Sequence, residues 1–148
     1  MDTIGLDSEA KEEEQLYQNS LEILSEIAGR SYEPGEKVFS EGDPGMEIHF
    51  IISGAVKIYL GHDDKRRELM TLTAGDIFGE MALLDQKPRS ASVEAYGPTR
   101  SLVLDRRLFY HLIGEYPILA KKVIELMGRR MRSMDSQFKQ ESGYSNLE

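Results

Sequence analysis

The chain has 148 residues, of which 40% are hydrophobic, so it is long enough for one buried core and short for two domains. It contains no cysteine, which excludes disulfides, thiolate metal sites and a thiol nucleophile. Its formal charge of −8 disfavours nucleic acid as a partner, because DNA binding requires clustered lysine and arginine. No apolar run reaches the roughly 18 residues of a membrane span, and the first residues lack the pattern of a signal peptide. We therefore expect a cytoplasmic protein that binds neither DNA nor membranes.

The charge is unevenly distributed along the chain. Residues 1–26 carry eight acidic side chains and one basic side chain, Lys11, whereas residues 100–132 carry eight basic and three acidic side chains. Mutual attraction of the two segments is one interpretation of this asymmetry. A solvated charged face is the more frequent reason for such a run, and we prefer it here.

The order of the predicted elements is helix, strands, helices. Residues 8–28 predict an amphipathic helix, because leucine and isoleucine recur at helical spacing among acidic residues, and Gly29 is available to end it. From residue 36 to residue 105 the chain changes to short runs separated by turns that contain glycine, proline or aspartate: KVF, EIHFIIS, AVKIYL, ELMTLT, ASVEAY and RSLVL. Strands of about six residues at this spacing are typical of a β-sandwich, jelly roll or barrel.

After residue 105 the helical pattern returns, with a short helix over 106–116 and a longer one that begins at Pro117, where the missing N–H has no cost. Five apolar side chains of the longer helix have the alternating spacing of a coiled coil: Ile124, Met127, Met131, Met134 and Phe138. This spacing predicts a homodimer through residues 117–138. Packing of the same stripe on the chain's own β domain is the alternative, and its methionines favour an adaptable surface.

Residues 74–93, AGDIFGEMALLDQKPRSASV, interrupt the strand pattern with a glycine, a helix-prone run and a loop. Gly79 permits close backbone approach, the first N–H groups of the helix attract an anion, and Arg89 can form a bidentate pair with a phosphate. Glu80 would be repelled by a phosphate, so a sugar hydroxyl is its natural partner. Taken singly, Arg89 would be a surface ion pair to Asp85 and Glu80 a helix N-terminal acid. A small nucleotide with one phosphate and a free 2′-hydroxyl would satisfy both groups together.

The segment 78–93, FGEMALLDQKPRSASV, resembles the phosphate-binding cassette of the cyclic-nucleotide-binding domain family, which includes the ligand domains of the bacterial catabolite activator and of protein kinase A regulatory subunits. Residues 32–59, YEPGEKVFSEGDPGMEIHFIISGAVKIY, are similar to the family's opening strands. The resemblance implies a mainly β fold: an eight-stranded β-roll or jelly roll with an N-terminal helix and a long C-terminal helix. It implies an acidic helical segment (1–30), a cyclic-nucleotide-binding domain that includes the lid or dimer helix (31–138) and a flexible tail (139–148).

The resemblance also implies roles for single residues. Arg89 binds the cyclic phosphate and Glu80 the ribose 2′-hydroxyl. The other implied contacts come from Gly79, Met81, Ala82, Ser90 and Ala91. Ser90 favours cyclic AMP over cyclic GMP as the ligand. Where the activator's last helix presents a threonine and a serine to adenine, this chain has Met134 and Asp135, which are therefore the candidate base cap.

We thus expect a non-catalytic regulatory module whose C-terminal helices move when the nucleotide binds, and which acts on an effector protein that the sequence does not identify. Because the chain ends soon after the long helix, we expect no DNA-binding domain in it. A metal enzyme of the cupin type is disfavoured, since His49, His62 and His111 are far apart in sequence and form no H-x-H pair. The remaining alternative is a degenerate fold of this family that serves as a protein-interaction scaffold.

Overall fold

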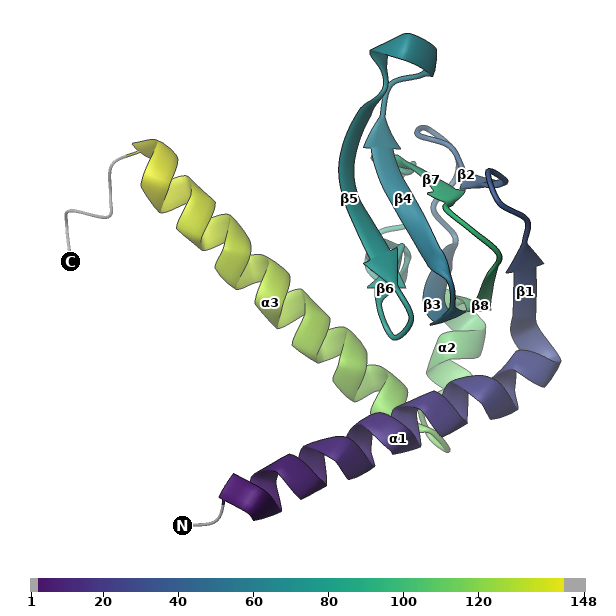
Figure 1. Cartoon of the computed structure of the whole chain (residues 1–148), viewed down its shortest axis with the longest axis vertical. Helices are drawn as coiled ribbons and strands as arrows, with labels where there is room; N and C mark the ends of the chain where they lie inside the picture. Colours follow the sequence, from purple (N-terminus) through teal and green to yellow (C-terminus); the bar gives the residue numbers. More distant parts are fainter. Residues whose placement is uncertain (1–2, 143–148) are drawn as a thin grey trace.

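Eight strands form two antiparallel sheets, and helices cover one of them (Figure 1). The computed structural model describes the backbone of residues 3–142 and the side chains of residues 7–134. The elements in chain order are α1 (Thr3–Ala28), β1 (Gly29–Tyr32), β2 (Lys37–Phe39), β3 (Glu47–Ser53), β4 (Ala55–Leu60), η1 (Asp63–Lys65), β5 (Arg67–Thr73), β6 (Ile77–Phe78), η2 (Glu80–Leu83), β7 (Ser92–Ala95), β8 (Thr99–Asp105), α2 (Arg106–Leu112) and α3 (Pro117–Ser142).

The strand order is that of a jelly roll. One sheet has the order β1-β8-β3-β6 and the other the order β2-β7-β4-β5, so strands distant in sequence are paired. The mainly β architecture with a helix at each end confirms the predicted fold class. The strands β1 and β6 lie outside the predicted runs, because four and two residues are too few to show an alternating pattern.

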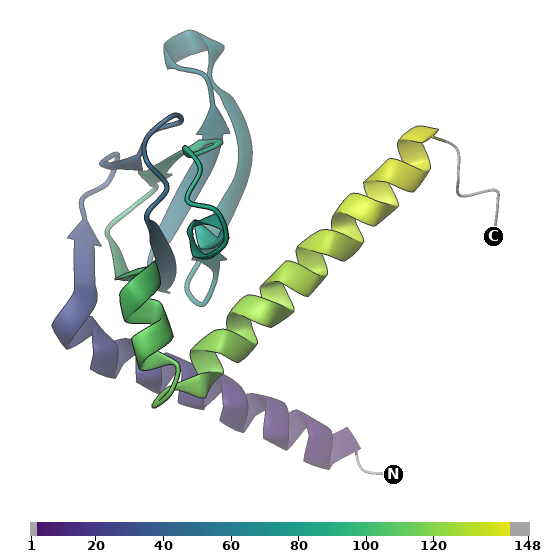
Figure 2. The ribbon, with the colours of Figure 1, turned by 180° about the vertical axis from the view of Figure 1, so that it is seen from behind.

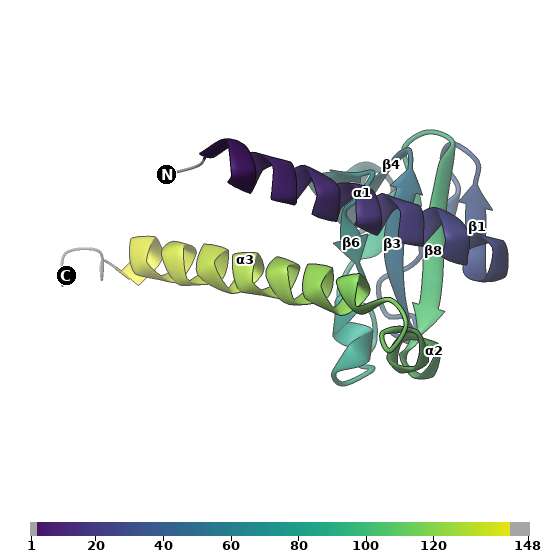
Figure 3. The same cartoon turned by 90° about the horizontal axis from the view of Figure 1, so that it is seen from below.

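The two faces of β3 bury different parts of the core. Ile48 and Phe50 point toward the helices, whereas Ile51, on the alternate face, packs between the sheets with Val56 and Val93. The helical cluster also contains buried side chains from all three α-helices: Tyr17, Leu21, Leu24, Phe109, Ile118, Leu119 and Val123. In Figure 3, α1 runs across the strands of this sheet.

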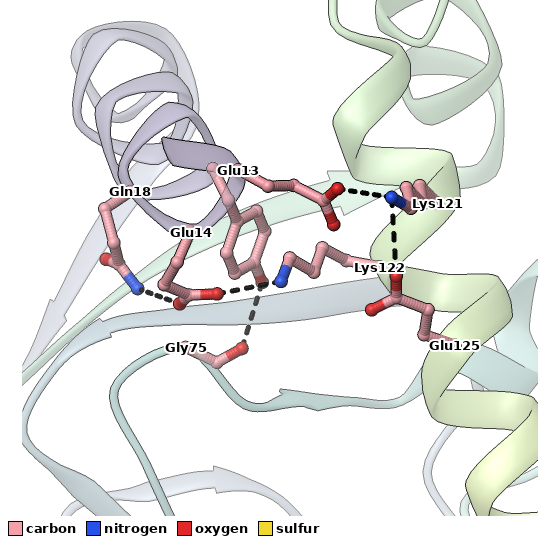
Figure 4. A network of polar contacts seen from close by, with 8 residues as sticks. Glu13, Glu14, Gln18, Gly75, Lys121, Lys122 and Glu125 are labelled. Carbon is pink, nitrogen blue, oxygen red and sulfur yellow. Dashed lines mark hydrogen bonds and ion pairs between the residues drawn. The ribbon is translucent and has the colours of Figure 1, made fainter. Parts of the chain in front are cut away.

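The acidic and basic segments of the chain meet where the first turns of α3 pass close to α1 (Figure 4). The Glu14 carboxylate is 2.8 Å from the Lys122 ammonium, and Glu13 pairs with Lys121. The preference for a solvated face is therefore wrong at these positions, and the alternative of mutual attraction holds. Because most of these side chains are partly exposed, solvent screens both pairs and their contribution to stability is small.

Tyr17 connects this junction to the β-roll. Its buried hydroxyl donates a hydrogen bond to the Gly75 carbonyl over 3.0 Å, and the Lys122 ammonium lies 5.1 Å from its ring centre. Gly75 belongs to the turn that leads into β6 and adopts a φ of 93°, a conformation that glycine adopts without strain. The side chain of Tyr17 thus joins α1, α3 and the turn before β6.

The C-terminal helices begin where the sequence predicts. The Asp105 carboxylate accepts a hydrogen bond of 2.7 Å from the Leu108 amide and caps α2, and α3 starts at Pro117. Helix α3 continues past the expected boundary at Phe138 to Ser142, and residues 143–148 of the expected tail lie outside the described residues. In Figures 1 and 2 this helix diverges from the strands. No helix in the described part of the chain is long and apolar enough to cross a membrane.

Candidate functional site

A cavity of about 430 Å³ lies between the strands of the β-roll and the segment that follows β6. All seven predicted contact residues line it: Gly79, Glu80, Met81, Ala82, Arg89, Ser90 and Ala91. Its walls also include apolar side chains that the sequence did not single out: Phe39, Ile58, Leu69, Met70, Phe78 and Val93. The predicted polar groups therefore share one space that has apolar walls, as ligand sites usually do.

Gly79 forms the turn between β6 and η2, with a φ of 76°. A Cβ at this position would lie 2.8 Å from Arg89 Nη1 and 2.8 Å from the Glu47 carbonyl oxygen, so only glycine fits without displacing them. The Ala82 amide donates to the Gly79 carbonyl over 3.1 Å and is used within the turn. The amides of Glu80 and Met81, at the start of η2, have no acceptor within the helix and are the donors this turn offers to an anion.

Hydrogen bonds fix both the backbone and the guanidinium of Arg89. Its amide donates to the Asp43 carbonyl over 2.7 Å, and its carbonyl accepts from the Gly42 amide over 2.8 Å. In the guanidinium, Nη2 donates to the Glu47 carbonyl over 2.6 Å and Nη1 to the Gly79 carbonyl over 3.4 Å. The turn between β2 and β3 thus positions the backbone, and two main-chain carbonyls position the charged group.

Arg89 forms no salt bridge with a described carboxylate, although the charges of Glu47 and Asp43 lie near enough to offset in part the lowering of its pKa by burial. The expected alternative, an ion pair to Asp85, does not form, and Nε is buried without a hydrogen-bond partner among the described residues. Burial lowers the pKa of the Arg89 guanidinium from its ordinary value, but arginine stays protonated in proteins. A half-buried cation with unused donors favours an anionic ligand, because a charge-assisted pair would offset the cost of its burial.

Glu80 is buried and contacts α3. Its carboxylate forms an ion pair with Arg130, whose Nη2 also donates to the Ile77 carbonyl over 3.2 Å. The sequence pattern does not distinguish Arg130, which is one of eight basic residues between 100 and 132 and follows no distinctive spacing. This ion pair links the predicted ribose-binding group to the C-terminal helix.

The structure describes the side chain of one of the two candidate base-cap residues, Met134. The Met134 side chain is 68% exposed and is not among the lining residues, and the side chain of Asp135 lies outside the described residues. The base-cap assignment therefore stays a prediction. Within the described residues, no three histidine, aspartate or glutamate side chains are grouped so that they could hold a metal ion.

The fold is a β-roll whose cavity combines arginine side chains with apolar walls. Residues 29–116 match the family model described as cyclic nucleotide-binding domain, which is more than half of the chain. The chain therefore belongs to the cyclic nucleotide-binding domain family. The matched range contains the whole segment from Gly79 to Ala91.

Individual relatives agree with this assignment. The chain is 37% identical over 113 residues to the cyclic AMP receptor protein of Thermus thermophilus, which covers 76% of this chain and 52% of that protein. It is 33% identical over 106 residues to the cAMP-dependent protein kinase type II regulatory subunit of Drosophila melanogaster, and this match covers 71% of the chain and 28% of that protein. The crystal structure of the Thermus thermophilus catabolite activator protein superposes with a TM-score of 0.70 at 33% identity. The superposition covers 88% of this chain and 59% of that one. The chain thus spans about half or less of the curated relatives' lengths.

Proposed function

We propose that this chain is a cytoplasmic, non-catalytic sensor of cyclic nucleotides that signals through a protein partner and not through DNA. The cyclic phosphate binds Arg89 and the backbone around Gly79, with Ser90 and Ala91 completing its shell, and the ribose 2′-hydroxyl binds Glu80. One observation carries the proposal. Arg89 reaches the cavity as a half-buried cation that is held by carbonyl oxygens and forms no salt bridge with any carboxylate that the structure describes.

Calorimetric titration of cyclic AMP and cyclic GMP into the wild type and Arg89→Ala tests this proposal. Loss of a desolvated charged contact costs about 2–5 kcal/mol, so affinity should fall at least thirtyfold, by about 1.4 kcal/mol per tenfold step. Lys87→Ala is the matched control, because Lys87 lines the same cavity but is exposed. We expect it to change affinity less than about threefold.

The two outcomes that contradict the proposal are distinct. Equal affinity of the wild type and Arg89→Ala would refute the assignment of the phosphate anchor. A wild type that binds neither nucleotide would refute the sensor and leave the interaction scaffold.

We favour cyclic AMP over cyclic GMP as the ligand. Ser90 lines the cavity and is exposed to it, and both curated relatives described above are named for cyclic AMP. The same titration measures the preference directly. A higher affinity of the wild type for cyclic GMP would overturn it.

The ion pair between Glu80 and Arg130 supports the proposed movement of the C-terminal helices. A ribose hydroxyl that donates to Glu80 competes with Arg130 for the same carboxylate, so the ligand would bind two positions of α3 with different affinities. Hydrogen exchange along residues 117–138 should therefore change when cyclic AMP is added. Identical protection with and without the nucleotide would refute the movement while leaving binding intact.

Homodimerisation through residues 117–138 is the last part of the proposal. Ile124, Met131 and Met134 are 69%, 70% and 68% exposed along α3, and a second copy of this helix would cover them. Analytical ultracentrifugation should show a dimer for the wild type and a monomer for Met131→Glu. A wild type that sediments as a monomer at high concentration would contradict this assignment.

A further inference from the structure

The guanidinium of Arg89 lies on the face of an aromatic ring. Its central carbon is 4.0 Å from the ring centre of Phe39, the last residue of β2, and both side chains line the cavity. We propose that Phe39 is a positioning residue for nucleotide binding, whose ring holds the Arg89 guanidinium in the orientation that the phosphate requires. This inference rests on the proposed function of the cavity.

Phe39 is itself fixed by two neighbouring aromatic rings. His49 of β3 and Phe78 of β6 stack with their centres 4.6 Å apart and their planes inclined by 11°. Phe39 packs against both at a tilt, with centre distances of 5.6 Å to His49 and 5.9 Å to Phe78. Its backbone pairs with Val93 of β7. Because strands of both sheets contribute to this contact, the ring offers a fixed surface to the arginine.

The Phe39 ring restricts the orientation of the Arg89 guanidinium in a way that its hydrogen bonds do not. The carbonyls of Glu47 and Gly79 each hold one terminal nitrogen, whereas the ring covers a face and thereby restricts rotation of the guanidinium plane. Attraction between a cation and a ring increases when the cation is desolvated, and Arg89 is half-buried. The contact therefore stabilises the buried charge and its orientation together.

An aromatic face differs from a carboxylate in its effect on a ligand. A carboxylate could hold Arg89 equally well, but it would neutralise the charge and compete with an incoming phosphate. A ring attracts the cation through its quadrupole and leaves the net charge available. A phosphate that pairs with Arg89 thus displaces no acidic side chain.

The segment that runs from β2 into the turn before β3 supplies both the Phe39 ring and the hydrogen bonds to the Arg89 backbone. Phe39 precedes the turn whose Gly42 and Asp43 hydrogen-bond to the backbone of Arg89. A Cβ at Gly45 would lie 2.4 Å from the Lys87 carbonyl oxygen, so the turn approaches the cassette closely. The backbone clamp on Arg89 and the ring therefore belong to one continuous segment of the chain.

Titration of cyclic AMP into Phe39→Leu tests the proposal, since leucine keeps an apolar side chain and removes the ring. We expect affinity to fall between about threefold and thirtyfold, the range of a partly desolvated cation–π contact. Phe39→Tyr should retain affinity within about threefold, because it keeps the ring. Val38→Ile is the matched control, since Val38 precedes Phe39 in β2 and does not line the cavity, and it should behave like the wild type.

A double-mutant cycle separates positioning from cavity shape. In an Arg89→Gln background, titrated at high cyclic AMP concentration, Phe39→Leu should change affinity less than about twofold, because no cation remains to be held. An equal loss with and without Arg89, or no recovery in Phe39→Tyr, would overturn the proposal.

The contact can also be measured without nucleotide. The NMR resonance of the Arg89 Nε proton should carry a ring-current shift in the ligand-free wild type that disappears in Phe39→Leu. An unshifted resonance would overturn the inference even where nucleotide binding is intact. Failure of the wild type to bind nucleotide would instead refute the proposed function.

Discussion

We predict that the ion pair between Arg130 of α3 and Glu80 stabilises the folded domain in the absence of ligand. Arg130→Ala removes the partner of a buried carboxylate and the hydrogen bond to the Ile77 carbonyl. Truncating one partner of a fully buried pair costs about 3–5 kcal/mol, whereas an exposed pair is worth about 0–1 kcal/mol. The side chain of Glu80 is 8% exposed and that of Arg130 is 34% exposed, so solvent screens the pair in part. Between these limits we expect a loss of about 2 kcal/mol in the free energy of unfolding.

Thermal and urea unfolding in the absence of nucleotide measure this loss. In a chain of this size, about 2 kcal/mol lowers the melting temperature by about 4–8 °C. Arg129→Ala is the matched control, because Arg129 is the exposed neighbour of Arg130 in the same helix, and it should be close to neutral. The loss should be smaller in a Glu80→Gln background, where no carboxylate is left without its partner.

Two results would refute the reasoning. Equal stability of Arg130→Ala and Arg129→Ala would show that the ion pair contributes nothing. Strict additivity of Arg130→Ala and Glu80→Gln would show that the two side chains do not interact in solution, since contacting residues couple by about 0.5–3 kcal/mol.

Three further predictions follow from single contacts. Burial, aided by the charges of Arg89 and Arg30, lowers the pKa of His49 from 6.5 to about 3, so the unfolded chain takes up a proton first as the pH falls. His49 should therefore not affect the free energy of unfolding above pH 6.5, but should lower it by about 2 kcal/mol by pH 5. Urea unfolding of the wild type at these two pH values should show this decrease, and urea unfolding of His49→Phe should not. Tyr17→Phe should cost about 1 kcal/mol by removing the hydrogen bond to the turn before β6, and an unchanged melting temperature would contradict this. Gly79→Ala should cost about 1–3 kcal/mol and weaken cyclic AMP binding, because its Cβ meets Arg89; wild-type affinity would disprove the close approach.

The predicted site residues come from one continuous segment, and that is why the sequence revealed them. Gly79, Glu80 and Arg89 lie within eleven residues, so the required chemistry is visible as a local pattern. Phe39 reaches the same cavity through the pairing of β2 with β7, and Arg130 reaches it through the packing of α3 against the core. Neither has a distinctive neighbourhood, because Phe39 follows an ordinary strand pattern and Arg130 stands among other basic residues.

The sequence pattern of α3 does not show which of its apolar side chains are buried, because the helix carries two stripes of them in different surroundings. The predicted apolar stripe runs through Met127, but the structure packs Met127 partly against the core, while Ile124 and Met131 are exposed. A second stripe, with Leu119 and Val123 buried, ends at Arg130 beside Glu80. Arg130 and Met131 are consecutive, so a movement of α3 that breaks the ion pair also displaces the exposed stripe. The proposed ligand switch and the proposed dimer surface are therefore mechanically coupled, and nucleotide should change the dimer affinity of the wild type more than that of Arg130→Ala.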